Sequence, residues 1–142
     1  MNIYKDCAFI KQGSPLIIAV DFDDTLVEAG DKFPEIKRPT KLMTQLAELK
    51  NNPLYHIQLI LWTCREDEYL DQAVEYCEKH GLTFDAVNEE APATLKWKPK
   101  GRKPFAHIYI DDRGLSVEEL NMPIRKVTKF DCLVNASNMG GQ

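Results

Sequence analysis

Three carboxylates, those of Asp21, Asp23 and Asp24, lie close together directly after the apolar run Leu16–Val20. Carboxylates held this close repel one another, so a metal ion or a basic side chain must balance their charge. Mg2+ prefers oxygen ligands and is commonly bound by one or two carboxylates together with the oxygens of a phosphate substrate. The segment Asp21–Thr25 therefore predicts a Mg2+ site that handles phosphate. The alternative is a polar turn rich in Asp, such as a helix N-cap after the strand.

Short apolar runs predict the strands that must position this cluster. The run Leu16–Val20 is rich in β-branched residues and follows Gly13, Ser14 and Pro15, which is typical of a strand buried on both faces. Similar runs predict strands over residues 56–62, 82–87 and 106–110, and an edge strand over residues 126–134.

Helical spacing of apolar residues predicts helices over residues 40–51 and 67–80, with Gly81 as the C-terminal glycine of the second. A short helix is expected over residues 115–120, and loops over residues 28–39 and 88–102, which are polar and contain glycine and proline. Strands that alternate with helices predict an α/β, three-layer domain with a central, mostly parallel sheet.

Polar side chains follow three of the predicted strands. Asp21 and Asp23 follow the first, Thr63 follows the second, and Asp111 and Asp112 follow the fourth. Parallel strands place all their C-terminal ends on one side of a sheet, and ligands bind at that edge in open α/β sheets. We therefore expect these side chains to converge, although they are far apart in the sequence.

Length and composition fit one domain over residues 1–142, with a core over residues 15–134 and a flexible tail over residues 135–142. The net charge of −4 does not favour nucleic acid or an anionic membrane surface, so a phosphate site must be locally basic. The sequence shows no apolar run long enough to cross a bilayer and no signal peptide, so we expect a cytoplasmic protein. The four cysteines have no zinc-like spacing and are interpreted as reduced thiols, with Cys64 taken as buried.

The chain resembles the haloacid dehalogenase superfamily, whose members have four motifs in this order and are mostly Mg2+-dependent phosphohydrolases with a Rossmann-like fold. The first motif, Asp-x-Asp-x-Thr after an apolar strand, is matched by Asp21, Asp23 and Thr25. Thr63 matches the second motif, a lysine the third, and the acids Asp111 and Asp112 the fourth. The resemblance covers residues 16–113, most of the chain.

The resemblance implies a role for each matched residue. Asp21 would be the nucleophile that becomes an aspartyl phosphate, and Asp23 would protonate the leaving alcohol and then activate water. Mg2+ would be held by Asp21, the Asp23 backbone carbonyl and Asp111, with Asp112 a direct ligand or a partner through water. Thr63 would donate a hydrogen bond to a phosphoryl oxygen. Asp24 stands where glycine is common in the family and is expected to cap the following turn.

The phosphate-binding lysine can be chosen from Lys96, Lys98, Lys100 and Lys103, which all precede the fourth strand. Lys103 is favoured because it is nearest to that strand, and Lys100 is second. Arg65 and Arg113 each follow a strand-end motif and could bind substrate. Alternatively, each of these arginines pairs with the acid cluster or with Glu66.

The spacing between the motifs leaves no room for a full cap domain, so the resemblance implies a small, capless phosphatase-like member. Such members act on bulky substrates or build a lid from a neighbouring subunit, which makes a homo-oligomer one expectation. The leading hypothesis is a Mg2+-dependent phosphomonoesterase acting on a phosphorylated small molecule. One alternative is a phosphatase for nucleotides or nucleic-acid ends, and another is a non-catalytic nucleic-acid-binding module, both using residues 96–103 with Trp97 as a stacking platform.

Overall fold

The computed structural model of the chain describes residues 15–96 and 101–114. It contains two compact units, residues 1–111 and 112–142, and of the second unit only residues 112–114 are described. The described elements are β1 (Leu16–Val20), β2 (Val27–Ala29), β3 (Ile36–Pro39), α1 (Lys41–Asn51), β4 (Ile57–Leu61), α2 (Asp67–Lys79), β5 (Ala86–Val87) and β6 (Ile108–Ile110). The prediction of a single domain over the whole chain stays a prediction.

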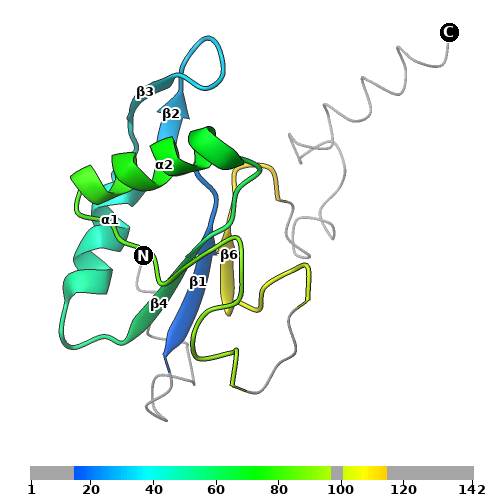
Figure 1. The fold of residues 1–142 in the computed structure, drawn as a ribbon. Helices are drawn as coiled ribbons and strands as arrows, with labels where there is room; N and C mark the ends of the chain where they lie inside the picture. Colours follow the sequence, from blue (N-terminus) through cyan, green and yellow to red (C-terminus); the bar gives the residue numbers. More distant parts are fainter. Residues whose placement is uncertain (1–14, 97–100, 115–142) are drawn as a thin grey trace, which may run out of the picture. The chain divides into compact units, whose positions relative to one another are not determined.

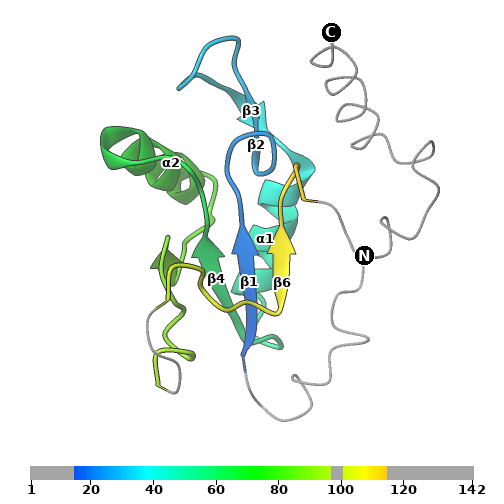
Figure 2. The same ribbon diagram turned by 90° about the vertical axis from the view of Figure 1, so that its right-hand side faces the viewer.

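Four strands form a sheet in the order β5-β4-β1-β6, and every neighbouring pair in it is parallel. The predicted α/β fold with a mostly parallel central sheet is confirmed. All five residues of β1 are buried, because this strand has a neighbour on each side and a packed layer on each face. Figure 1 shows β1 between β4 and β6, and Figure 2 shows that the three arrows point the same way.

Both helices cover the same face of the sheet. Alternate residues of β1 (Leu16, Ile18 and Val20) share a hydrophobic core with buried residues of α1 and α2, among them Met43, Leu46, Ala73 and Cys77. Leu46 is one of the residues whose helical spacing predicts α1, and the two helices begin and end within about one residue of the predicted bounds. The amphipathic pattern therefore identified the buried side of each helix.

The opposite face of the sheet is covered by the connection between β5 and β6. Ile17, Ala19 and Ile60 from the sheet pack there with Ala91 and Ala106 of the connection. The Glu90 carboxylate, which is 2% exposed, accepts hydrogen bonds from the Phe105 N–H at 2.9 and 3.0 Å and fixes the two ends of the connection to each other. The predicted three-layer arrangement thus has helices on one face and, in the described residues, an irregular connection on the other.

A β-hairpin follows β1, where the sequence predicts a loop over residues 28–39. Strands β2 and β3 pair antiparallel, with an irregularity at Glu28 and Ala29. In the loop between the two strands, Gly30 lies so close to Glu35 that an added Cβ would come within 2.4 Å of the Glu35 Cβ, so only glycine fits. The loop prediction was wrong because these strands are short and, apart from the buried Val27, largely exposed, and therefore lack the apolar alternation of half-buried strands.

The remaining expectations differ in extent. Strands β5 and β6 are shorter than the predicted strands over residues 82–87 and 106–110. The predicted helix over residues 115–120, the edge strand over residues 126–134 and the tail over residues 135–142 lie outside the described residues. Within the described ranges, none of the helices has the length and apolar character needed to span a membrane.

Candidate active site

Asp21 follows the last residue of β1 at the C-terminal edge of the sheet. Its backbone N–H donates to the Ile110 carbonyl of β6 at 3.0 Å, which continues the parallel ladder past the strand end. The side chain is half-buried, and its Oδ1 accepts the N–H of Phe22 at 2.7 Å. Asp21 is thus held in place by the main chain on both sides of it.

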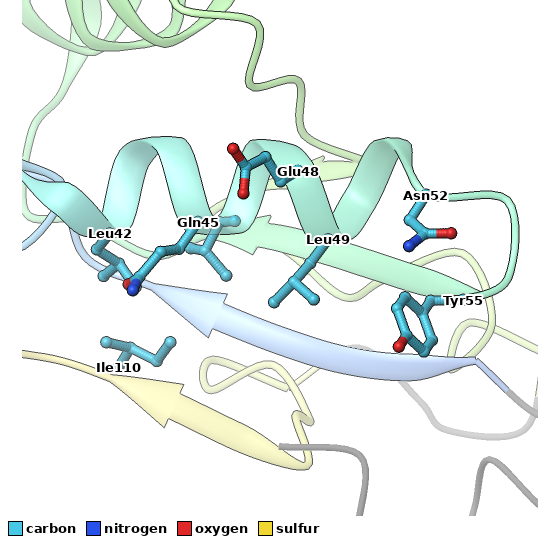
Figure 3. A pocket seen from close by; sticks show the side chains of 8 residues that line it. Leu42, Gln45, Glu48, Leu49, Asn52, Tyr55 and Ile110 are labelled. Carbon is cyan, nitrogen blue, oxygen red and sulfur yellow. The ribbon is translucent and has the colours of Figure 1, made fainter. Parts of the chain in front are cut away.

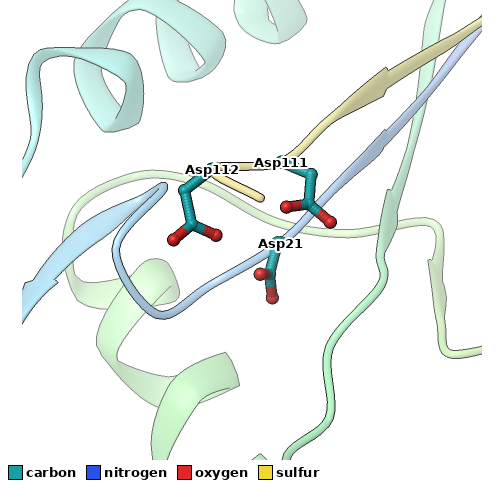
Figure 4. Close-up of side chains that lie close together, drawn as sticks. All are labelled: Asp21, Asp111 and Asp112. Carbon is teal, nitrogen blue, oxygen red and sulfur yellow. The ribbon is translucent and has the colours of Figure 1, made fainter. Parts of the chain in front are cut away.

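Asp111 follows β6, the strand beside β1, and brings a second carboxylate to the same edge. Asp21, Asp111 and Asp112 can each offer one carboxylate oxygen such that all three oxygens lie within 4.8 Å of one another. Figure 4 shows the three side chains, with those of Asp111 and Asp112 on the segment that follows β6. The convergence follows from the direct pairing of β1 with β6.

The spacing of these oxygens can be compared with the ligand spacing of a small divalent cation. In an octahedral Mg2+ site with bonds of about 2.1 Å, ligands on opposite sides of the ion lie about 4.2 Å apart. Ligands on adjacent sides of such an ion lie about 3.0 Å apart. Oxygens within 4.8 Å of one another could therefore contact one ion after their side chains adjust. Exposed acidic groups are also common without a metal, so Mg2+ stays a prediction.

Thr63 lies beyond the end of β4, on the other side of β1. The Trp62 N–H donates to the Val20 carbonyl at 2.9 Å, so the chain is still paired with β1 one residue before Thr63. The Thr63 hydroxyl accepts the Arg65 N–H at 3.2 Å, and the Thr63 N–H donates to the Asn88 side-chain oxygen at 2.8 Å. The order β4-β1-β6 therefore flanks Asp21 with Thr63 on one side and Asp111 on the other.

Asp23 makes an ion pair with Arg65 instead of standing alone in the turn. Arg65 Nε donates to Oδ2 and one terminal nitrogen donates to Oδ1, each at 2.8 Å, which is a bidentate pair. The Asp23 side chain keeps 29% of its exposure, whereas Arg65 is 2% exposed as a residue. The sequence left two roles open for Arg65, binding substrate or pairing with an acid. The structure shows Arg65 paired with Asp23 of the acid cluster, and this geometry does not support a contact between Arg65 and substrate.

Asp24 and Thr25 shape the turn. Asp24 has a φ of 57°, the left-handed region, and its Oδ1 accepts the Ala29 N–H at 3.1 Å. This contact fits the expected turn-capping role, and the backbone angle explains why a residue tolerant of left-handed geometry stands there. The Thr25 hydroxyl oxygen is buried and has no hydrogen-bond partner among the described residues.

The predicted basic residues lie at different places. Lys103 Nζ is 4.5 Å from the centre of the Tyr109 ring, and Arg113 is an exposed side chain with Nε 3.8 Å from Asp112 Oδ2. Lys100 lies outside the described residues. The phosphate-binding role of Lys103 and the substrate contacts of Lys100 and Arg113 therefore stay predictions.

Two of the four cysteines lie among the described residues, and both are free thiols. Cys64 is exposed, which corrects the interpretation of this thiol as buried; it lies in the polar segment after β4, beyond the packed layers. Cys77 lies on the buried face of α2, and burial raises the pKa of its thiol to about 12. Trp62 and Phe105 pack against the second core.

A pocket of about 360 Å³ lies away from these acids, along α1 and beside Ile110 of β6. Figure 3 shows its lining, in which Leu42, Leu49 and Tyr55 form an apolar wall with a few polar side chains around it. The pocket contains none of the strand-end acids. It has no part in the candidate site.

Sequence reasoning missed two contributors to the site, Asn88 and the hairpin tip at Phe33 and Pro34. Asn88 has a φ of 52°, a left-handed backbone that asparagine tolerates. Its position directly after a predicted strand was the signal that the sequence offered. The Pro34 carbonyl accepts a hydrogen bond from Arg65 at 3.1 Å, a long-range contact that no spacing in the sequence indicates.

Comparison with known proteins gives one informative relative. No protein-family model and no curated protein matches the chain. Among solved structures, the chain is similar to that of a conserved protein coded by a locus from Bacteroides thetaiotaomicron, with 36% sequence identity and a TM-score of 0.57. The match covers 72% of this chain and 79% of that chain.

Proposed function

We propose that this chain, which belongs to the same family as the conserved protein from Bacteroides thetaiotaomicron, is a Mg2+-dependent phosphomonoesterase that works through a phosphorylated aspartate. The observation that carries the proposal is the strand order β4-β1-β6, which brings Thr63, Asp21 and Asp111 to one edge of the sheet. A nucleophile flanked by a hydroxyl donor and further carboxylates suits phosphoryl transfer, which depends on positioning and on neutralising charge.

Two aspartates would share the covalent chemistry. An oxygen of Asp21 forms a bond to phosphorus while the bond from phosphorus to the leaving oxygen breaks, and Asp23 gives its proton to that oxygen. Asp23 then takes a proton from a water molecule whose oxygen bonds to phosphorus, and the bond between Asp21 and phosphorus breaks. Phosphate leaves, and both side chains return to their starting state.

The neighbouring residues would stabilise charge. Asp21, Asp111 and Asp112 would hold Mg2+, which when bound neutralises part of the negative charge on the phosphoryl oxygens. The Thr63 hydroxyl accepts from the Arg65 N–H, so its own O–H can donate to one of those oxygens. Lys103 is the proposed phosphate-binding lysine.

Replacing Asp21 tests the nucleophile directly. Asp21→Asn should abolish release of phosphate from an aryl phosphate in the presence of Mg2+, because a neutral amide is a poor nucleophile. Asp24→Asn is the matched control, since asparagine tolerates the left-handed backbone and keeps the oxygen that accepts the Ala29 N–H. Activity that survives in Asp21→Asn, or that falls equally in both variants, would refute the role of Asp21.

The class of substrate can be separated by a screen. A phosphorylated small molecule is the leading proposal, and a nucleotide or nucleic-acid end is the alternative, because Lys96, Arg102 and Lys103 are exposed in the basic segment. Salt-dependent binding of single strands that Asp21→Asn leaves unchanged, without phosphate release, would instead indicate a binding module. The cytoplasmic location and a homo-oligomeric state stay predictions.

A further inference from the structure

The guanidinium of Arg65 is saturated with hydrogen bonds. Arginine carries five N–H donors, and all five are used here. They donate to Asp23 Oδ2 and Oδ1 at 2.8 Å each, to the Pro34 carbonyl at 3.1 Å, to the Tyr69 carbonyl at 3.2 Å and to Gln72 Oε1 at 3.0 Å. No N–H of Arg65 is left for an oxygen of a substrate.

Aromatic rings close off the rest of the guanidinium. Its Cζ lies 4.8 Å from the centre of the Phe22 ring and 5.0 Å from that of Phe33, distances at which a cation is attracted to a ring. The residue is 2% exposed, and Asp23 is the one charged group among its hydrogen-bond partners. While Asp23 is ionised, its carboxylate and the Arg65 guanidinium therefore neutralise each other, with Arg65 shielded from water and the Asp23 side chain still 29% exposed. The proposed proton donor is the form of Asp23 that has taken up a proton.

These partners come from three separate elements. Asp23 lies in the turn after β1, Phe33 and Pro34 lie in the hairpin between β2 and β3, and Tyr69 and Gln72 lie in α2. Figure 2 shows the hairpin and α2 on the side of the sheet toward which the arrows of β1 and β4 point. The Phe33 ring also contacts the Tyr69 ring, with centres 5.1 Å apart. A single side chain thus fixes a carboxylate, the hairpin and the start of a helix.

We propose that Arg65 is a positioning residue, which holds the Asp23 carboxylate in one orientation beside the hairpin tip and does not touch substrate. The proposal rests on the proposed function, in which Asp23 moves a proton to the leaving oxygen and later takes one from water. A proton donor works only within hydrogen-bond reach of its acceptor, so the orientation of Asp23 governs this step. The substrate class that needs Arg65 most is the phosphate ester of an alcohol, whose leaving oxygen must be protonated.

Arg65→Lys tests this role because lysine keeps the charge but cannot form the bidentate pair. The readouts are kcat and KM for an alkyl phosphate and for p-nitrophenyl phosphate, whose leaving group departs without a proton. We expect kcat for the alkyl phosphate to fall by about 100-fold, the loss that a misplacement of about 1 Å can cause, with KM within about twofold. The loss for p-nitrophenyl phosphate should be about tenfold smaller.

Gln72→Met is the second variant, in case Arg65→Lys does not fold. It removes one acceptor of the guanidinium and leaves the ion pair with Asp23 intact, so the same leaving-group dependence is expected at a smaller, several-fold scale. Purely structural damage would lower kcat equally for both substrates, and a direct substrate contact would raise KM. Either result would overturn the positioning role.

The same measurements distinguish a failure of the positioning role of Arg65 from a failure of the proposed phosphatase function. If the unmodified protein releases no more phosphate from any compound than Asp21→Asn does, the proposed function fails and the role of Arg65 fails with it. If the unmodified protein is active and Asp21→Asn is not, a KM effect or equal losses in the Arg65 and Gln72 variants refute the positioning role alone.

Discussion

The backbone N–H of Thr63 donates a 2.8 Å hydrogen bond to the side-chain oxygen of Asn88, which ties the segment after β4 to the segment after β5. Asn88 is itself anchored, because its N–H donates to the Leu61 carbonyl at 2.7 Å. Its backbone is left-handed, with a φ of 52°. The position of Thr63 beside Asp21 therefore depends on a residue in another strand connection.

Removing the Asn88 amide should loosen Thr63. Asn88→Gly accepts the left-handed backbone without strain but removes the oxygen, so we expect kcat for phosphate release to fall by about tenfold, the effect of about 1.4 kcal/mol. Asn88→Asp keeps an accepting oxygen and is the matched control, with a smaller loss. Equal kcat values for Asn88→Gly and the unmodified protein would show that Thr63 is held by other contacts.

Removing one acid of the cluster should weaken metal binding. Asp111→Asn replaces a charged oxygen ligand by a neutral one, and we expect the Mg2+ concentration for half-maximal binding to rise by about tenfold or more, measured by calorimetry without substrate. Asp71→Asn, an exposed acid of α2 that is not part of the cluster, should leave the affinity unchanged. Unaltered affinity in Asp111→Asn would place the metal elsewhere.

The elements with strong apolar patterns are those that the sequence predicts well. The strand Leu16–Val20 and the helices α1 and α2 each present a continuous or periodic apolar pattern, because each must bury residues in the core. The neighbourhood of Asp21 and Asp111 follows from the same physics. Once the strands are parallel, their C-terminal ends share one edge.

The contacts made by single polar side chains are not readable from such patterns. Arg65 pairs with Asp23, which lies 42 positions away in the sequence. This pairing depends on where the turn after β1 meets the hairpin and α2. The hairpin itself is largely exposed and is held by strand pairing and by a salt bridge between Arg38 and Glu28, so it gives little apolar signal. Sequence spacing indicates which ends converge, and tertiary packing decides which charges pair.

His107 should make folding stability depend on pH. Its Nδ1 accepts the Ile17 N–H at 2.9 Å, which requires the unprotonated nitrogen, and burial lowers the pKa of the ring from its usual 6.5. Between that lowered pKa and 6.5 the unfolded chain binds a proton that the folded protein does not, so the free energy of unfolding falls as the pH drops below 6.5.

Unfolding in urea at several pH values between about 5 and 7 measures this effect, since that window spans the ordinary pKa of histidine. His107→Asn keeps an accepting oxygen near the place of Nδ1 but does not titrate, so its free energy of unfolding should change less with pH over this window. His56 and His80 are present in both proteins and cancel in the comparison. Identical pH dependence in the two proteins would mean that His107 does not contribute.

Gly81 should matter for stability because it ends α2 in the left-handed region, with a φ of 81°. The Leu82 N–H donates to the Cys77 carbonyl at 2.9 Å and the Gly81 N–H donates to the Glu78 carbonyl at 3.0 Å, the pattern of a Schellman motif. Nothing lies within 4 Å of a Cβ added at Gly81, so a substitution there meets strain from the backbone alone.

Gly81→Ala is therefore expected to lower the free energy of unfolding by about 1 kcal/mol, measured by urea denaturation. Gly81→Asn should lose less, because asparagine enters the left-handed region more readily than alanine. Glu78→Ala, at an exposed position in the last turn of α2, controls for the general effect of a surface change. The space around Gly81 is open, so the backbone angle is the one source of strain for a substitution there. If Gly81→Ala is as stable as the unmodified protein, the helix end must relax to another conformation.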